Sequence, residues 1–228
     1  MDAQAFLEQI LNSAKDLASQ GRNLAEKRLD IPESGPERDA TISAMGKGAM
    51  AAGALALLLG TGVGRRLTGT ALKLGGLAAV GGLAYKAYQN WQAGQGKGQT
   101  EPGTPVGKLS GSEAEKRSLL LLKAMIAAAK ADGHVDDAEG AKIEDQISKL
   151  GLESDILQFL QEEISSPLDV EAIAAGVDSP EAAAEVYLAS RLILDVDQAP
   201  ERAYLDRLVS ALKLDPELVS QLDAQVSG

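Results

Sequence analysis

The chain has 228 residues, with 33 acidic and 22 basic side chains, a formal net charge of −11 and no cysteine. The absence of cysteine excludes disulfides, thiolate catalysis and cysteine-ligated metals. Residues 101–228 carry 25 acidic and 11 basic side chains, and this negative field argues against nucleic acid as a partner because it repels phosphate.

The amino-terminal arm, residues 1–40, is expected to contain an amphipathic helix over residues 3–29. Apolar residues recur there at helical spacing, which places them on one face. They are Phe6, Leu7, Ile10, Leu11, Ala14, Leu17, Ala18, Leu24 and Ala25. The segment from Ile31 to Pro36 contains two prolines and a glycine and is expected to end the helix.

Residues 43–92 form a glycine-rich hydrophobic segment, and residues 41–100 include no Asp or Glu. The run from Gly48 to Gly64 has no charged residue; as a helix it would be ~26 Å long, close to a ~30 Å bilayer core. Lys47, Arg65 and Arg66 flank this run, within reach of lipid headgroups. The pattern predicts a membrane helix or helical hairpin in a lipid bilayer, and the alternatives are a Gly/Ala-rich linker or a buried soluble hairpin.

A second apolar piece, from Leu74 to Tyr85, is too short to cross a bilayer alone. It is expected either to complete a hairpin or to lie in the membrane interface, with Tyr85, Tyr88 and Trp91 as an aromatic belt. Glycines that repeat every seven residues predict self-association of such helices. Basic residues after the uncharged run favour the cytoplasmic side for the carboxyl-terminal domain of a single-span protein.

Residues 93–112 are rich in Gly, Pro and polar side chains and are expected to be a flexible linker. Residues 113–228 are expected to form an all-α domain, because helix-start signals recur and no strand alternation is present. Ser112 with Glu115, and Asp136 with Glu139, match capping boxes. Two further helices are expected to begin at Ser179-Pro180 and Asp215-Pro216, where proline follows a good cap.

The all-α domain contains a pseudo-repeat at a shift of 62 residues. It aligns Glu139 with Glu201, and Leu150-Gly151-Leu152 with Leu212-Lys213-Leu214. Two related helix pairs that pack face to face are therefore expected.

Acidic residues crowd the two turns that this repeat relates. Asp132, Asp136 and Glu139 form a candidate divalent-cation site, with Asp195, Asp197 and Glu201 as a second candidate set. Carboxylate oxygens suit Mg²⁺, Ca²⁺ or Mn²⁺, and His134 could add a ligand or a pH response. The spacing is not that of an EF-hand, and the same residues also serve as helix caps and helix ends. No other cofactor is expected. Without a nucleophile–base constellation or a phosphate-binding loop after a strand, the chain is expected not to be an enzyme.

Two segments carry a resemblance to a known family: GGLAYKAYQNWQ, residues 81–92, and AAAKADGHVDDAE, residues 127–139. The chain resembles the YebE-type inner-membrane proteins, a family of unknown function, over roughly residues 43–226. Its carboxyl-terminal domain is similar to the tellurite-resistance TerB domain, an all-helical fold of two related halves. The resemblance implies attachment to the bacterial inner membrane and a domain that binds divalent metal or protein partners. Gln198 stands where the repeat would place the counterpart of Asp136, which argues against symmetrical metal binding.

Two functions are therefore expected as alternatives. In the first, the protein is a non-enzymatic, membrane-anchored interaction module for a protein partner, in an envelope or metal/metalloid stress response. In the second, the tethered domain is a divalent-cation sensor.

Overall fold

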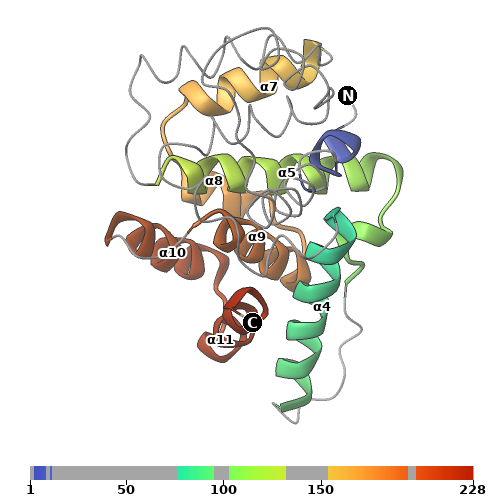
Figure 1. Ribbon diagram of the computed structural model, residues 1–228, viewed down its shortest axis with the longest axis vertical. Helices are drawn as coiled ribbons and strands as arrows, with labels where there is room; N and C mark the ends of the chain where they lie inside the picture. The colour runs from blue at the N-terminus through green and yellow to red at the C-terminus, as the bar shows by residue number, and fades with distance from the viewer. Residues whose placement is uncertain are drawn as a thin grey trace, which may run out of the picture.

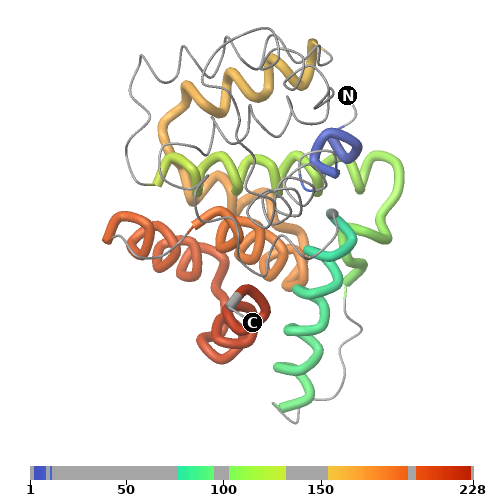
Figure 2. The backbone as a smooth tube through the Cα atoms, viewed as in Figure 1, coloured from blue at the N-terminus to red at the C-terminus, as the bar shows by residue number. Residues whose placement is uncertain are grey.

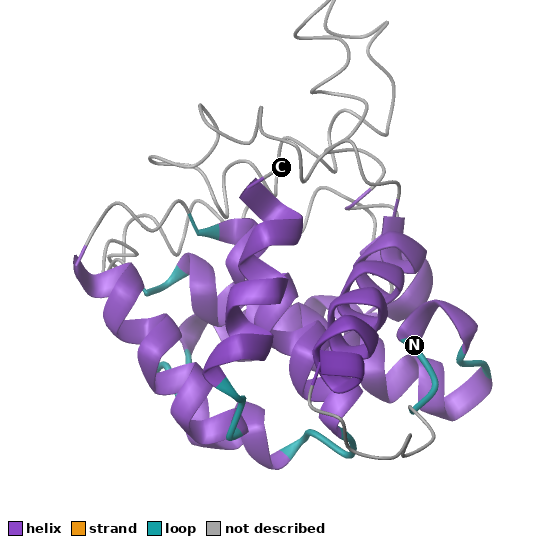
Figure 3. Cartoon of the chain, turned by 90° about the horizontal axis from the view of Figure 1, so that it is seen from below, coloured by secondary structure: helices purple, strands orange, loops and turns teal. Residues whose placement is uncertain are grey.

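The computed structural model describes residues 3–8, 11, 76–94, 103–131, 154–194 and 199–227. All the regular structure in these ranges is helical (Figures 1 and 3), which confirms the all-α prediction. Residues 3–8 form a short helical stretch at the amino end. The other elements are α4 (Gly76–Gly94), the 3₁₀-helix η3 (Val106–Lys108), α5 (Gly111–Ala129), α7 (Ser154–Ser165), α8 (Val170–Ala175), α9 (Pro180–Ile193), α10 (Ala199–Leu212) and α11 (Pro216–Ser227).

Helix α9 lies at the centre of the fold and packs against α5, α4, α11 and α10. Most of its side chains are buried, on every face of the helix, as expected for a helix surrounded by others. Its start is the one predicted: Ser179 accepts a hydrogen bond from the Ala182 backbone N–H at 3.2 Å, and Pro180 occupies the first helical position.

Helix α4 is an integral part of this packed unit. Five of its apolar side chains recur at helical spacing and are buried: Leu77, Val80, Ala84, Ala87 and Tyr88. They face α9 and α11, and the tube in Figure 2 shows α4 beside the carboxyl-terminal helix. Tyr88 packs on Trp91 with ring centroids 5.4 Å apart. The residues expected as an interfacial aromatic belt therefore lie on a helix whose apolar face is covered by protein.

The predicted location in the inner membrane, with the carboxyl-terminal domain in the cytoplasm, is wrong. Within the described ranges, no helix is both long enough and apolar enough to cross a bilayer. The apolar side chains of α4 are instead buried against other helices of the protein. The uncharged run of residues 48–64 lies outside the described residues.

Part of the expected linker is also packed. Val106 in η3 is fully buried, and its backbone N–H donates to Oε1 of Glu185 at 2.7 Å. Glycines allow η3 to approach α4 closely. A Cβ on Gly81 would lie 3.0 Å from Cγ1 of Val106, and a Cβ on Gly107 would lie 2.7 Å from Cα of Ala78. Residues 103–110 therefore form a fixed connection between α4 and α5.

The end of α10 lies at a position that the pseudo-repeat aligns with Leu150-Gly151-Leu152. Lys213 adopts a left-handed φ of 54°. Its N–H donates to Ser210 O and the Leu214 N–H donates to Val209 O, which is the Schellman pattern. The repeat aligns Lys213 with Gly151, the residue type that this backbone conformation favours. The first half of the repeat, residues 139–152, lies outside the described residues, so the two-halves architecture stays a prediction.

Candidate functional sites along α5

The first candidate site lies at the amino-terminal end of α5, where it receives residues 3–8 (Figure 1). The Ala3 backbone N–H donates to both carboxylate oxygens of Glu115, each at 3.1 Å. Phe6 and Leu7 are buried in the hydrophobic core, and Leu11 packs against it. We use the name α5 groove for the surface around Glu115 on which residues 3–8 lie with Phe6 and Leu7 buried.

The role of Glu115 differs from the prediction. A capping box with Ser112 was expected, but α5 begins at Gly111 with Ser110 as its N-cap residue. The Glu115 carboxylate instead caps the first turn of the 3–8 helix, from a position 112 residues away in sequence. The first N–H groups of a helix lack intrahelical partners and carry partial positive charge, so a carboxylate is a favourable acceptor there.

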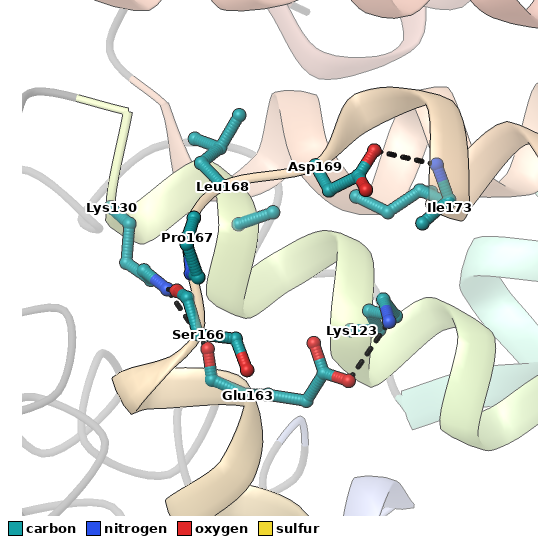
Figure 4. A pocket seen from close by; sticks show the side chains of 10 residues that line it. Lys123, Lys130, Glu163, Ser166, Pro167, Leu168, Asp169 and Ile173 are labelled. Atoms are coloured by element: carbon teal, nitrogen blue, oxygen red, sulfur yellow. Dashed lines mark hydrogen bonds and ion pairs between the residues drawn. The ribbon is translucent and has the colours of Figure 1, made fainter.

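The second candidate site is a cavity of about 290 Å³ at the other end of α5 (Figure 4). We call it the α5–α8 pocket. Helix α5 contributes two residues and its C-cap residue Lys130 a third, and the rest come from α7, α8 and the loop between them. The lining residues are Lys123, Ala127, Lys130, Glu163, Ser166, Pro167, Leu168, Asp169, Ala172 and Ile173.

Each charged group at the pocket has a defined contact. Lys123 forms an ion pair with Glu163 at 2.9 Å. The Lys130 ammonium donates to the backbone carbonyls of Glu163, at 2.9 Å, and Ser166. Asp169 accepts a hydrogen bond from the Ala172 N–H at 2.8 Å and so caps α8. Burial lowers the pKa of Lys130, and the negative charge of Glu163 opposes this shift.

The loop that shapes the pocket follows from its sequence. Ser165 is the last residue of α7, and Pro167 follows two residues later. Proline cannot continue a helix, because it lacks the N–H and its ring clashes with the preceding turn. The chain therefore turns at Ser166 and restarts as α8 behind Asp169, whose side chain supplies the cap.

A buried ion pair in the interior joins α5 to α9. Nη1 of Arg117 donates to Oε2 of Glu185 at 2.7 Å, and Nη2 donates to Asp178 at 2.5 Å. Arg117 and Glu185 are 6% and 1% exposed. Burial raises the pKa of Glu185, while its hydrogen bonds from Val106 and Arg117 oppose that shift. Through Glu185, the pair ties α5 to α9 and also to η3.

Of the predicted metal ligands, the structure describes only Glu201. Asp132, His134, Asp136, Glu139, Asp195 and Asp197 lie outside the described residues. Glu201 is described: it lies in the first turn of α10 and is 4% exposed. Among the described residues, no group of three or more His, Asp or Glu side chains is placed to hold a metal ion. The divalent-cation site stays a prediction.

Sequence reasoning singled out none of the pocket residues, and at the first site it named Phe6, Leu7 and Glu115 without predicting that they meet α5. The pocket left a weak signal, because Lys123, Ala127 and Lys130 are spaced to share one face of a helix that is otherwise apolar. Glu185 left another, as a charged residue among apolar ones, AAAEVYLA. The contact of Glu115 with Ala3 left no local signal, because it depends on two distant segments meeting.

Comparisons with known proteins extend over most of the chain. A family model described as "Protein of unknown function (DUF533)" matches residues 44–226. A protein of Yersinia enterocolitica, described as "Uncharacterized protein in ampR 5'region", is 30% identical over 112 residues, which are 49% of this chain and 81% of that protein. No solved structure shows significant similarity to the chain.

Proposed function

The chain belongs to the DUF533 family of proteins of unknown function, and we propose that it is a non-enzymatic interaction module whose α5 groove binds an amphipathic helix of a protein partner. The observation that carries the proposal is the seating of residues 3–8. Ala3 and Leu7 are at most 1% exposed, and Glu115 caps the helix end.

The chemistry of the seated segment defines the partner. Isolated short helices are marginal in water, so burial of Ala3, Phe6 and Leu7 and the contact with Glu115 support the helical form of this segment. In this contact an aromatic side chain, Phe6, and an aliphatic one, Leu7, are buried in the core, and the Glu115 carboxylate accepts from the first N–H group. This is recognition of a helix in a groove, in which apolar anchors on one face provide most of the affinity.

The amino-terminal segment would act as an internal competitor for the partner. The segment and α5 belong to the same chain, so their contact is intramolecular. An intramolecular ligand can act at an effective concentration of roughly millimolar. A partner helix with the same apolar pattern would then bind by displacing residues 3–8. The resemblance of residues 127–139 to TerB domains is compatible with such a module and is part of the proposal.

The test is binding in trans. A fluorescent peptide of residues 1–12 is added to a chain that lacks those residues, and anisotropy is measured. We expect saturable binding, a roughly tenfold or greater loss with Phe6→Ala in the peptide, and weaker binding to the full-length chain, whose groove is occupied. Absence of saturable binding to a truncated chain that unfolds cooperatively would contradict the proposal.

Glu115 has a matched control on the same helix. Glu115→Gln in the truncated chain should weaken the peptide, because an amide is a poorer acceptor than a carboxylate for positively polarised N–H groups. Glu113→Gln removes the same charge from an exposed position two residues away and should leave binding unchanged. If truncation prevents folding, a ¹⁹F label at Phe6 of the full-length chain reports displacement by excess peptide instead. An unchanged label spectrum at saturating peptide would then overturn the proposal.

A further inference from the structure

The α5–α8 pocket is lined by two lysines and two carboxylates, and one of its ammonium groups, that of Lys130, has no direct ion pair with another described residue. Lys123 and Lys130 face Glu163 from α5, but only Lys123 forms a side-chain ion pair with it. The Lys130 ammonium bonds to two neutral carbonyls, which take two of its three hydrogens. The other carboxylate in the lining, Asp169, is bonded to the first turn of α8.

An anion in the pocket would complete this arrangement. The third hydrogen of Lys130 and the remaining hydrogens of Lys123 are the available donors. Among the described residues, the Lys130 ammonium bonds directly only to neutral carbonyls, so a negative charge beside it would add a direct ion pair to the longer-range attraction of Glu163. The Asp169 carboxylate in the lining favours a ligand with a single negative charge, because it would repel a dianion more strongly than a monoanion.

The apolar lining residues and the volume of the cavity indicate the polarity and size of the rest of the ligand. Ala127 and Ile173 are buried apolar residues from α5 and α8, and Leu168 is a half-buried one from the loop. The cavity of about 290 Å³ lies at the small end of the range for ligand pockets, roughly 300–1,000 Å³. A ligand of about the size of one amino acid therefore matches the space.

We propose that the α5–α8 pocket binds a small monocarboxylate with an apolar body, its carboxylate between Lys130 and Lys123 and its apolar part against Ala127 and Ile173. The site is separate from the α5 groove and does not depend on the function proposed for that groove. The same chemistry is offered by a free carboxylic acid and by the last residue of a peptide that ends in an apolar amino acid.

The first experiment compares a charged probe with its neutral analogue on the full-length chain. Titration with 4-methylpentanoate, followed by NMR, should give saturable shifts at Ala127 and Ile173. The amide 4-methylpentanamide, of the same shape, should bind at least about tenfold more weakly, which is about 1.4 kcal/mol. Equal binding of the two probes would overturn the proposal. So would a result in which the acid, the amide and the leucine-ended peptide described below all fail to bind.

Variants assign the binding to the pocket. Lys130→Met should lower the affinity for the acid about tenfold or more, whereas Lys116→Met, at an exposed position of α5 outside the pocket, should not change it. Lys130→Met also removes the bonds to the end of α7. Ala172→Phe therefore serves as a second variant, since Ala172 is an exposed lining residue and a phenyl ring there fills the mouth. A folded Ala172→Phe chain that binds the acid as the parent does would contradict the proposal.

A peptide arm distinguishes the two sources of the ligand. A peptide ending in leucine is compared with its carboxyl-terminal amide on the same chain and the Ala172→Phe variant. Binding of the free-acid peptide alone assigns the site to a protein carboxyl terminus, and binding of 4-methylpentanoate alone assigns it to a small metabolite. Either result supports the proposal.

Discussion

At the scale of single residues, burial gives several polar side chains roles that their positions in the sequence do not reveal. Arg117 and Glu185 compensate each other in the interior and tie α5 to α9 and η3. Ser190 and Tyr204 share a second buried network, in which both hydroxyls lie within hydrogen-bonding distance of the Ala124 carbonyl. Buried groups of this kind need partners, because an unpaired one costs about 1–3 kcal/mol.

Tyr204→Phe tests the second network. The hydroxyl lies 3.1 Å from Oγ of Ser190 and donates to the Ala124 carbonyl at 3.2 Å. Its removal should lower the free energy of unfolding by about 1–2 kcal/mol at neutral pH, measured by urea denaturation. Tyr85→Phe, at a partly exposed position of α4, is the matched control and should change stability little.

The pH dependence of the same variant has a defined sign. Burial raises the pKa of Tyr204 from 10.0 to about 12. The folded chain therefore keeps this proton at a pH where the unfolded chain has lost it. The contribution is fully present below pH 10 and is lost as the pH rises through about 12. The stability difference between the parent and Tyr204→Phe should be constant below pH 10 and shrink above it; a difference that stays constant to pH 12 would contradict the assignment.

At the scale of elements, glycine on α4 serves close packing inside a helical unit. Helix α4 meets η3 through Gly81, while the adjacent Gly82 is exposed. The two glycines are equivalent in the sequence, and only their neighbours in space distinguish them. The prediction that this segment completes a membrane hairpin or lies in the membrane interface failed for the same reason, because small and apolar residues suit close helix contacts in protein as well as in lipid.

Substituting the two glycines by alanine should shift stability in opposite directions. A Cβ on Gly81 would lie 3.0 Å from Val106 Cγ1 and 3.1 Å from Oε1 of Glu185, so Gly81→Ala should destabilise the chain by about 1–3 kcal/mol. Gly82→Ala meets nothing within 4 Å and should stabilise it by about 0.5–1 kcal/mol, because alanine loses less backbone entropy in a helix. Thermal and urea unfolding of both variants measure this, and equal effects would contradict the α4–η3 contact.

At the scale of the whole molecule, the packed unit extends beyond the domain expected from sequence. The boundary was placed at residue 113, after a flexible linker. In the structure α4 covers α9 and α11, and η3 links it to α5. Removal of α4 would expose these covered faces, and exposed apolar area costs about 25 cal/mol per Å².

Two fragments test where the unit begins. A chain of residues 76–228 should unfold cooperatively, whereas a chain of residues 113–228 should lose cooperativity or aggregate, because the apolar surface under α4 becomes exposed. Differential scanning calorimetry and analytical ultracentrifugation compare them directly. Equal transition temperatures for the two fragments would show that α4 adds nothing to the unit.

Part of the fold was predictable from local signals. The starts of α9 and α11 were predicted correctly, because Ser179 and Asp215 cap the following turn and proline occupies the next position. The burial of Phe6 and Leu7 also matches the predicted apolar face. The role of Glu115 was predicted wrongly, since a capping box is a local pattern and its true partner, Ala3, is distant in sequence.

The sequence by itself determined the helical class, several helix ends and the apolar faces, because caps, proline and helical periodicity act within a few residues. Only the tertiary structure decided what those faces cover: α4 against α9 and α11, residues 3–8 against α5, and Lys130 beside the end of α7. The physical reason is that hydrophobic attraction is non-directional. An apolar face therefore requires burial without specifying its partner, and only the folded arrangement of all the helices makes that choice.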